Sequence, residues 1–364
     1  MHHETLLSSW VYWVICFLFF ALANRCDNYK KRALCETISF FIIFLFAVLR
    51  YDIGNDYLTY WNAGELGNAT RNYELISGAI IDLAFYLRFP PLIFIVFASV
   101  SLFGYRRLIR AKSSNPPLSW YMYFTFPLFF LQDCSSVRQA GAMGLFILGY
   151  SYIEDKKIWI AILCLLLSVF FHTSAAIGFL ILFKPLYEKL NVKFSVLLLI
   201  LCSISGKVIE KVILGYLGNT LLGDKFEYYL QGENPGFNTM QYLLYFIFVA
   251  NILFFNKLIK DNSRNKVYIN LFTIGMAIYV LFTIEPITAI RFSTFFFMFE
   301  IMLIPSYKNI IAQFVASKPF ANGAIICLMF ALQMTLINIY INAYNTGVME
   351  RPVYVPYKTW LNHI

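Results

Sequence analysis

The sequence predicts an all-α polytopic membrane protein, with about twelve transmembrane helices in one domain spanning residues 1–364. Two observations predict this class. Hydrophobic residues make up 60% of the chain and charged residues only 13%, whereas soluble domains carry about 25% charged residues. Apolar runs also recur along the whole chain, separated by polar segments. A water-soluble core could not bury this much apolar surface, so we expect lipid to be the solvent.

Twelve apolar runs are candidate crossings. They lie at about residues 9–23, 33–49, 89–105, 118–132, 139–153, 158–171, 173–183, 194–206, 239–256, 267–284, 292–305 and 322–342. The first run follows no Lys or Arg and precedes no small-residue cleavage site, so it does not resemble a signal peptide.

Basic residues predict the orientation of these crossings. Most Lys and Arg fall in short loops on one face, such as Lys30-Lys31-Arg32 and Arg106-Arg107. The positive-inside rule makes this face cytoplasmic and places both termini outside, in agreement with an even number of crossings. The net charge of +9 is thereby explained by topology, and we expect no nucleic-acid partner.

Residues 158–183 strain this count. They number 26, whereas two full crossings need about 40 residues. A single crossing would move most of the later Lys to the outside, so we predict a hairpin of two short or tilted helices. Its turn, His172-Thr173-Ser174, would be recessed below the outer surface and lined by protein or a wet cavity.

The predicted outer face carries long loops, at about residues 50–88 and 207–238, and a tail from residue 343. Apolar residues recur at helical spacing over 75–87 and over 208–217. Each segment is expected to form an amphipathic helix at the outer lipid boundary, where it either covers a cavity or simply packs at the interface.

The predicted outer loops carry more Arg than Lys, whereas the inner loops carry mostly Lys. Arg50, Arg138 and Arg291 lie at the ends of apolar runs, where an unpaired charge is costly. The guanidinium fork binds phosphate or carboxylate bidentately, so three such residues on one face favour an anionic ligand. Ser135-Ser136 would begin a helix beside Arg138 and add to the attraction for anions. Snorkelling or an internal ion pair, such as Arg291 with Glu285, is the alternative.

The densest polar segment runs from Arg50 to Trp61, directly after a crossing. Gly54-Asn55 predicts a turn that allows positive φ. Asp52 and Asp56 could then face a shared pocket, where a carboxylate could deprotonate or orient a hydroxyl. The aromatic residues that suit stacking on a sugar are Tyr57, Tyr60 and Trp61. The alternative is an interfacial aromatic belt with an Arg–Asp salt bridge.

His172 is the only histidine away from the termini. In an outward-facing turn it could act as a base or donate to a phosphate, or it could be satisfied by backbone alone. The seven cysteines contain no C-x-x-C pair, so neither a disulfide framework nor a metal site is indicated. No Gly-rich phosphate loop is present either, so a sugar donor should be activated by lipid phosphate and used outside.

At these residues the sequence resembles the EpsG-type family of polysaccharide polymerases, which are related to the O-antigen polymerase Wzy. The matching motifs are R-Y-D-I-G-N-D-Y-L-T-Y from Arg50 to Tyr60, Val137-Arg138-Gln139-Ala140, Phe171-His172-Thr173-Ser174, and Arg291 at the start of a late helix. The order and approximate spacing agree over nearly the whole chain. Each motif is short, so the specificity lies in their combination.

The resemblance implies a GT-C-like helical fold in the bacterial inner membrane, with the active site facing the periplasm. The expected reaction joins oligosaccharide repeat units carried on undecaprenyl diphosphate into O-antigen or a related surface polysaccharide. No metal or cofactor is expected. The expected partners are the lipid-linked oligosaccharides, a chain-length regulator and a repeat-unit flippase.

The same resemblance suggests roles for the site residues. The diphosphate would be held by Arg138 and Arg291, with Arg50 assisting. The acceptor hydroxyl would be activated or oriented by Asp52, Asp56 or His172. The remaining substrate contacts would come from Tyr57, Tyr60 and Gln139.

The main alternative is a flippase for the same lipid-linked units. A flippase needs charge along a central path between related halves, whereas the charged candidates here lie at outer helix ends. A glycosyltransferase that adds one branch sugar and a membrane O-acyltransferase are enzymatic alternatives, although an acyl donor from the cytoplasm would need inward-facing groups. A generic transporter would carry several ionisable residues inside its helices, and Glu300 is the clearest such residue.

Overall fold

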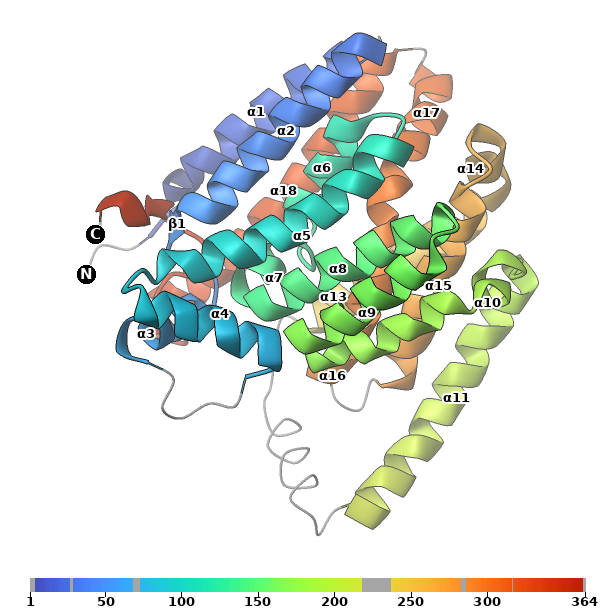
Figure 1. Ribbon diagram of the computed structural model, residues 1–364. Coiled ribbons are helices and arrows are strands. Elements are labelled where there is room, and N and C mark those ends of the chain that lie inside the picture. Colours follow the sequence, from blue (N-terminus) through green and yellow to red (C-terminus); the bar gives the residue numbers. More distant parts are fainter. Residues whose placement is uncertain are drawn as a thin grey trace. The chain divides into compact units, whose positions relative to one another are not determined.

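The computed structural model describes residues 4–26, 29–67, 73–217, 237–282, 286–315 and 317–362. Regular structure within these ranges is helical, apart from two strands of two residues each. The predicted all-α class is therefore confirmed. Figure 1 shows the course of the chain.

The elements follow the chain in this order. The N-terminal half contains η1 (Leu6–Ser9), α1 (Trp10–Arg25), α2 (Tyr29–Leu49), β1 (Arg50–Tyr51), α3 (Tyr57–Leu66), α4 (Leu75–Tyr86), α5 (Pro91–Lys112), α6 (Pro116–Thr125), α7 (Phe130–Ser135), α8 (Val137–Glu154), α9 (Ile158–Phe171) and η2 (Thr173–Leu182). The C-terminal half contains α10 (Lys184–Glu188), α11 (Val192–Leu217), α13 (Phe237–Leu253), α14 (Phe255–Asp261), α15 (Asn265–Leu281), α16 (Pro286–Phe297), η3 (Met298–Met302), α17 (Ile304–Val315), α18 (Lys318–Asn345), β2 (Lys358–Thr359) and η4 (Trp360–Asn362).

Several helices are long and apolar enough to cross a membrane. Within the described residues four stretches qualify by themselves: Leu6–Arg25, Lys30–Leu49, Pro91–Lys112 and Lys318–Asn345. Two bent helix pairs, α13 with α14 and α16 with α17, raise the number to six if each pair is one span. The chain is thus a multi-pass membrane protein. The count of twelve crossings stays a prediction, because the other apolar helices have only 10–17 residues.

The chain divides into two compact units. The first unit contains residues 1–179 and 307–364, and the second contains residues 180–306. The first unit is built from both ends of the chain, so the C-terminal tail is available to the N-terminal loops.

Close packing of α5, α8 and α9 forms the centre of the first unit. A Cβ atom added to Gly104 of α5 would overlap the carbonyl group of Gly144 of α8, and one added to Gly144 would overlap the backbone of α5. Ser168 of α9 donates to the carbonyl oxygen of Ala142 at 2.7 Å. Small residues allow helices to approach this closely in lipid, where van der Waals contact replaces the hydrophobic effect as the driving force.

Aromatic side chains join α1, α2, α6 and α7 elsewhere in the first unit. The ring of Phe46 on α2 lies 5.6 Å from that of Tyr12, 5.5 Å from Phe124 and 5.4 Å from Phe130, measured between centroids. The hydroxyl group of Tyr12 donates to the carbonyl oxygen of Tyr354 at 2.9 Å. The C-terminal tail is therefore anchored to the helices by a buried hydrogen bond.

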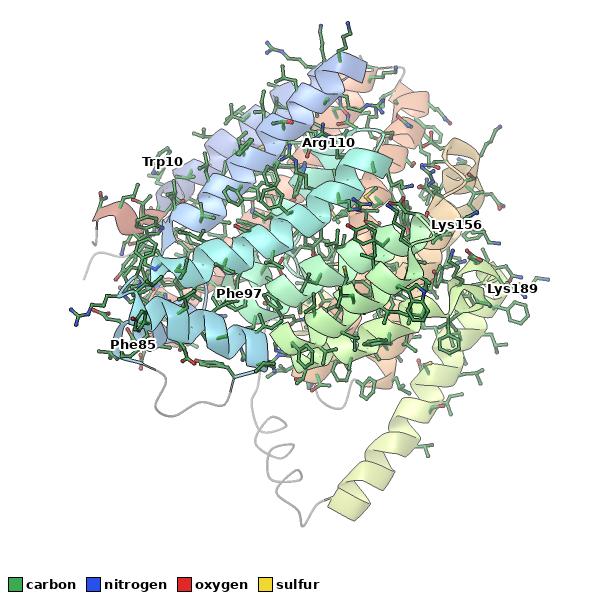
Figure 2. The ribbon with its side chains drawn as sticks, viewed as in Figure 1. Trp10, Phe85, Phe97, Arg110, Lys156 and Lys189 are labelled. Carbon is green, nitrogen blue, oxygen red and sulfur yellow. The ribbon has the colours of Figure 1, made fainter. Side chains whose placement is uncertain are left out.

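The two ends of the first unit differ in composition. Arg110 and Lys156 lie toward one end of its helices, and Trp10 and Phe85 lie toward the other (Figure 2). At the basic end Arg106 of α5 donates to the buried Glu36 of α2 at 3.2 Å. The helices α3 and α4, which belong to the predicted loop of residues 50–88, lie at the opposite end (Figure 1). Arg110 and Lys156 of two predicted inner loops thus lie at the end of the first unit opposite to α3 and α4. The identity of the cytoplasmic face stays a prediction.

The second unit is organised around α15. This helix is buried from Tyr268 to Val280 and contacts α10, α11, α13, α14, α16 and η3. Asn270 of α15 donates to the carbonyl oxygen of Leu190 at 3.1 Å. Asn251 of α13 donates to the buried carboxylate of Glu300 at 2.9 Å, in the 3-10 segment that follows α16. The Asn270 amide nitrogen and the Glu300 carboxylate thus each have a polar partner, which offsets part of the cost of their burial.

One of the two predicted amphipathic helices has the expected bounds. Residues 75–86 form α4, in agreement with the periodicity. The segment 208–217 does not form a helix of its own, because α11 continues from Val192 to Leu217. No proline interrupts it and Gly206 keeps a negative φ, so the helical hydrogen bonding has no reason to stop. Residues 218–236 of the predicted loop lie outside the described residues.

The break predicted at the His172-Thr173-Ser174 turn is present. α9 ends at Phe171, His172 is extended with φ −158° and ψ 125°, and the 3-10 segment η2 begins at Thr173. The two segments have 14 and 10 residues. Each is shorter than a full crossing, and the hairpin arrangement stays a prediction.

The contact between α5 and α8 predicts the effect of a substitution. Gly144→Leu should lower the thermal denaturation midpoint in detergent, because overpacking of a tight contact costs about 1–3 kcal/mol. Gly78→Ala on α4 is the control, since its added Cβ would lie 3.7 Å from Tyr73, an ordinary contact. Equal midpoints for the two variants would contradict the tight contact.

Candidate active site

The start of α8 presents the arginine that the sequence singled out. α8 begins at Val137, directly after Ser136, so Arg138 lies in its first turn. Its side chain is 23% exposed and can be reached from outside the protein. The unpaired N–H groups of a first helical turn favour negative charge nearby. The predicted helix start beside Arg138 is thus confirmed.

Three side chains hold Arg138 in place. Its Nε donates to the hydroxyl oxygen of Tyr60 at 2.9 Å. Its Nη1 pairs with Oε2 of Glu74. The guanidinium carbon lies 4.9 Å from the centre of the Tyr73 ring. The plane of the guanidinium is therefore fixed by α3, by the start of α4 and by stacking.

Glu74 links Arg138 to the turn after α9. Its second oxygen, Oε1, accepts the backbone N–H of Thr173 at 3.2 Å. Burial raises the pKa of the Glu74 carboxyl, but its own backbone N–H, Arg138, His172 and the Thr173 N–H together outweigh burial. The net pKa lies below the usual value, so Glu74 is an anion at neutral pH.

His172 lies next to this carboxylate with one ring nitrogen already engaged. Its Nδ1 is 3.2 Å from the backbone nitrogen of Ser174 and 2.7 Å from the Ser174 hydroxyl. A backbone N–H can only donate, so Nδ1 accepts, and a neutral ring carries its proton on Nε2. In this conformation His172 is suited to donate a hydrogen bond through Nε2 rather than to accept a proton there.

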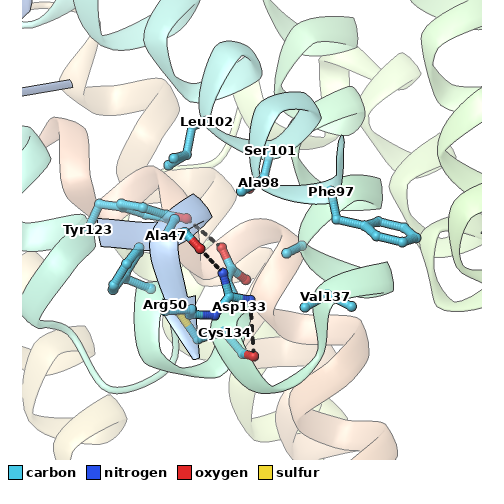
Figure 3. A pocket seen from close by; sticks show the side chains of 12 residues that line it. Ala47, Arg50, Phe97, Ala98, Ser101, Leu102, Tyr123, Asp133, Cys134 and Val137 are labelled. Atoms are coloured by element: carbon cyan, nitrogen blue, oxygen red, sulfur yellow. Dashed lines mark hydrogen bonds between the residues drawn. The ribbon is translucent and has the colours of Figure 1, made fainter. Parts of the chain in front are cut away.

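Arg50 occupies a different environment. It is buried, at 2% exposure, and donates to the carbonyl oxygens of Ala47 and Cys134 (Figure 3). Its guanidinium carbon lies 5.1 Å from the Phe94 ring centre. Beside it a cavity of about 20 Å³ is lined by Asp133, whose carboxylate accepts the hydroxyl of Tyr123 at 2.7 Å. This volume suits one water molecule. Arg50 thus ties the end of α2 to the end of α7.

The turn after Arg50 is clamped by the C-terminal tail. Arg351 pairs with the Asp52 carboxylate and donates to the carbonyl oxygens of Gly54 at 2.7 Å and Asn55 at 2.9 Å. β1 and β2 pair antiparallel, with Arg50 opposite Thr359. Gly54 has φ +110°, and a Cβ there would overlap the carbonyl group of Cys134. The predicted Gly54-Asn55 turn with positive φ is confirmed, and only glycine fits it.

The remaining predicted site residues of the first unit differ in burial. Tyr57 and Gln139 are buried, whereas Asp56 is exposed. Tyr57 is fully buried, stacks on Phe94 at 4.1 Å and donates to the Arg50 carbonyl oxygen at 3.0 Å. Asp56 precedes α3 and acts electrostatically on Tyr60. Burial raises the pKa of the Tyr60 hydroxyl, although Arg138 opposes this. Gln139 follows Arg138 on α8 and is buried.

Arg291 belongs to the second unit. It lies on α16, which begins at Pro286, and its side chain is half-buried. Its predicted partner Glu285 lies outside the described residues. The first unit by itself therefore brings together Arg138, Tyr60 and the His172 turn.

Sequence reasoning missed Glu74 and Arg351. Glu74 directly precedes the apolar period of α4, a position that favours acidic residues, so a local signal for it existed. Arg351 has no such signal, because its partner Asp52 is 299 residues away along the chain. Only the folded tail brings the two together.

Comparison with known proteins gives one match. The family model described as EpsG family matches residues 33–358. The chain belongs to the EpsG family. Searches of curated proteins and of solved structures found no match. The match to the EpsG model covers both units and includes every residue of the site described above.

The contribution of the Arg351 clamp to the stability of this EpsG family member can be tested by substitution. Arg351→Gln should destabilise the protein by about 1–3 kcal/mol, because three acceptors of the turn lose a charged donor. Asp52→Asn combined with Arg351→Gln should cost less than the sum of the single changes, since the two groups are in contact. Thermal denaturation in detergent measures both.

The matched control is Lys358→Gln, which removes a positive charge from an exposed position of the same tail. A loss for Arg351→Gln no larger than for Lys358→Gln would show that the clamp does not stabilise the fold.

Proposed function

We propose that this EpsG family protein polymerises oligosaccharide repeat units carried on undecaprenyl diphosphate. The growing chain would pass from its lipid diphosphate onto the sugar of an incoming lipid-linked unit, at the periplasmic face of the bacterial inner membrane. The product would be O-antigen or a related surface polysaccharide, and a flippase and a chain-length regulator would be its partners. Family membership supports a polysaccharide polymerase-like role at the coarser level.

The observation that carries the proposal is the environment of Arg138. A partly exposed guanidinium, oriented by Tyr60 and Tyr73 at a helix start, suits a diphosphate leaving group. Departure of a diphosphate needs stabilisation of the developing negative charge, which a preoriented cation provides without metal. His172 would add a donor through Nε2. Arg291 stays a proposed second ligand of the diphosphate.

The structure shapes the roles proposed for the other residues. Arg50, Asp52 and Tyr57 are engaged in contacts that hold the turn, so we infer that they position the site rather than bind sugar. Tyr60 touches Arg138 directly and remains a candidate for contact with substrate. Asp56 remains a candidate for orienting the acceptor.

The flippase alternative is favoured by one observation. In the second unit the buried Glu300 lies in the break between α16 and α17, and the α13–α14 pair bends by 68°. Broken helices around a buried ionisable residue are typical of transporters. Deletion of the gene distinguishes the two functions. Loss of a polymerase leaves a single repeat unit on the lipid core, whereas loss of a flippase leaves none.

Substitution of Arg138 tests the proposed role of its fork. Arg138→Ala and Arg138→Lys should both reduce the polysaccharide ladder at least 100-fold, because Lys keeps the charge but not the bidentate geometry. Gel separation of surface polysaccharide measures the ladder, with immunoblotting to show that the variants reach the membrane.

Arg110→Lys is the control, since Arg110 is exposed at the other end of the first unit. A normal polysaccharide ladder from Arg138→Lys would show that the bidentate geometry of the guanidinium is not required.

The orientation can be tested independently. Alkaline phosphatase fused after Asn345 should be active, because the positive-inside rule predicts that the end of α18 lies outside, whereas a fusion after Lys260 should be inactive. The opposite pattern would place the Arg138 site on the cytoplasmic face.

A further inference from the structure

Glu74 divides its two oxygens between partners of different kinds. Oε1 accepts a backbone N–H, that of Thr173, at 3.2 Å. Oε2 pairs with a side chain, that of Arg138. The backbone cannot move away without moving the turn after α9, whereas a side-chain partner can be exchanged. The carboxylate is therefore anchored beside His172 whether or not Arg138 stays bound to it.

A phosphate would compete with Glu74 for Arg138. The Nε of Arg138 is occupied by the Tyr60 hydroxyl at 2.9 Å, which leaves the edge formed by Nη1 and Nη2 for bidentate binding. Glu74 already binds Nη1. A diphosphate that takes this edge must displace Oε2, and it carries more negative charge than a carboxylate. Binding of the leaving group would thus free one oxygen of Glu74.

Two of the three candidate bases predicted from the sequence, Asp52 and His172, are engaged in ways that Arg138 does not control. Asp52 is held by Arg351 at the tail. His172 accepts at Nδ1 and so carries its proton on Nε2. Glu74 is 14% exposed and Arg138 is 23% exposed, so a sugar hydroxyl can approach the pair without unfolding.

We propose that Glu74 is the general base of the transfer and that diphosphate binding at Arg138 releases it for this role. This inference rests on the proposed function. It adds a catalytic residue that acts on the acceptor, whereas Arg138 acts on the donor.

The proposed step transfers one proton and one glycosyl group. The acceptor hydroxyl gives its proton to Oε2 of Glu74, and its oxygen forms a bond to the anomeric carbon of the donor. The bond from that carbon to the diphosphate oxygen breaks, and its electron pair leaves with the diphosphate, which Arg138 stabilises. Glu74 later returns the proton to water. No oxidant, reductant or further reactant is needed.

Electrostatics at the site agree with this order of events. Burial raises the pKa of Glu74, while backbone N–H groups, Arg138 and His172 lower it. When the diphosphate neutralises Arg138, one of the lowering causes is lost, so the pKa of Glu74 rises and the carboxylate becomes a stronger base. Among the described residues, the charged and titratable groups around Glu74 are Arg138 from α8, His172 from the end of α9, Tyr60 from α3 and the adjacent Tyr73.

The experiment separates binding from turnover in Glu74→Gln. The amide still accepts the Thr173 N–H but neither takes a proton nor competes as an anion for Arg138. We expect ladder formation to fall at least 100-fold, the usual contribution of a general base. Binding of undecaprenyl diphosphate to the purified full-length protein should be unchanged or tighter, with undecaprenyl monophosphate as the weaker reference ligand.

Two further variants sharpen the test. Glu65→Gln, at an exposed position of α3, removes the same charge nearby and should match the wild type in both measurements. Glu74→Asp keeps a carboxylate one methylene shorter and should recover part of the activity that Glu74→Gln loses.

Three outcomes would overturn the inference. Turnover of Glu74→Gln within about threefold of wild type would show that Glu74 is not the base. Loss of binding together with turnover would show that Glu74 only anchors Arg138 and the turn. Equal losses in Glu74→Asp and Glu74→Gln, with binding retained in both, would also remove the carboxylate from the chemistry. A wild-type protein that does not bind undecaprenyl diphosphate would instead refute the proposed function itself.

Discussion

Direct backbone contact between α5 and α8 is the constraint on which the candidate site depends. Gly104 and Gly144 leave no room for side chains between the two helices, so the position of α8 is set by α5. α9 is then held against α8 by Ser168 and by the Phe171 ring, which a Cβ at Gly141 would overlap. Arg138 lies in the first turn of α8 and His172 follows α9, so both are placed by one rigid contact. In lipid such contact is a main source of specificity between helices.

The sequence predicted the features that local patterns determine. The membrane class follows from apolar runs, α4 from helical periodicity, the start of α8 from Ser135-Ser136, and the break at His172 from the short length of residues 158–183. The sequence did not predict that α11 continues through the segment expected to form a separate helix. α11 runs on to Leu217 because an amphipathic pattern alone gives no stop signal. The division into two units depends on contacts between distant segments, which a single sequence does not reveal.

The sequence motifs identify the residues of the candidate site. They do not distinguish residues that are accessible to a substrate from residues that hold the site in place. Arg50 and Arg138 look alike in the sequence, since both are arginines at the ends of apolar runs. The fold buries Arg50 against carbonyl groups and leaves Arg138 partly exposed beside Tyr60. The difference arises from tertiary neighbours: Cys134 receives Arg50, and Glu74 receives Arg138. The spacing of the motifs does not predict such tertiary partners, although the motifs do identify Arg50 and Arg138 themselves.

The clamp by Arg351 also has a consequence for biosynthesis. Asp52 emerges from the ribosome early, but the guanidinium that binds it follows 299 residues later. Membrane insertion proceeds along the chain, so the turn at Gly54 stays without its clamp until α18 and the tail have been inserted. A chain interrupted before the tail would carry every motif of the site without the ordered turn. Formation of the clamped turn is thereby coupled to completion of synthesis.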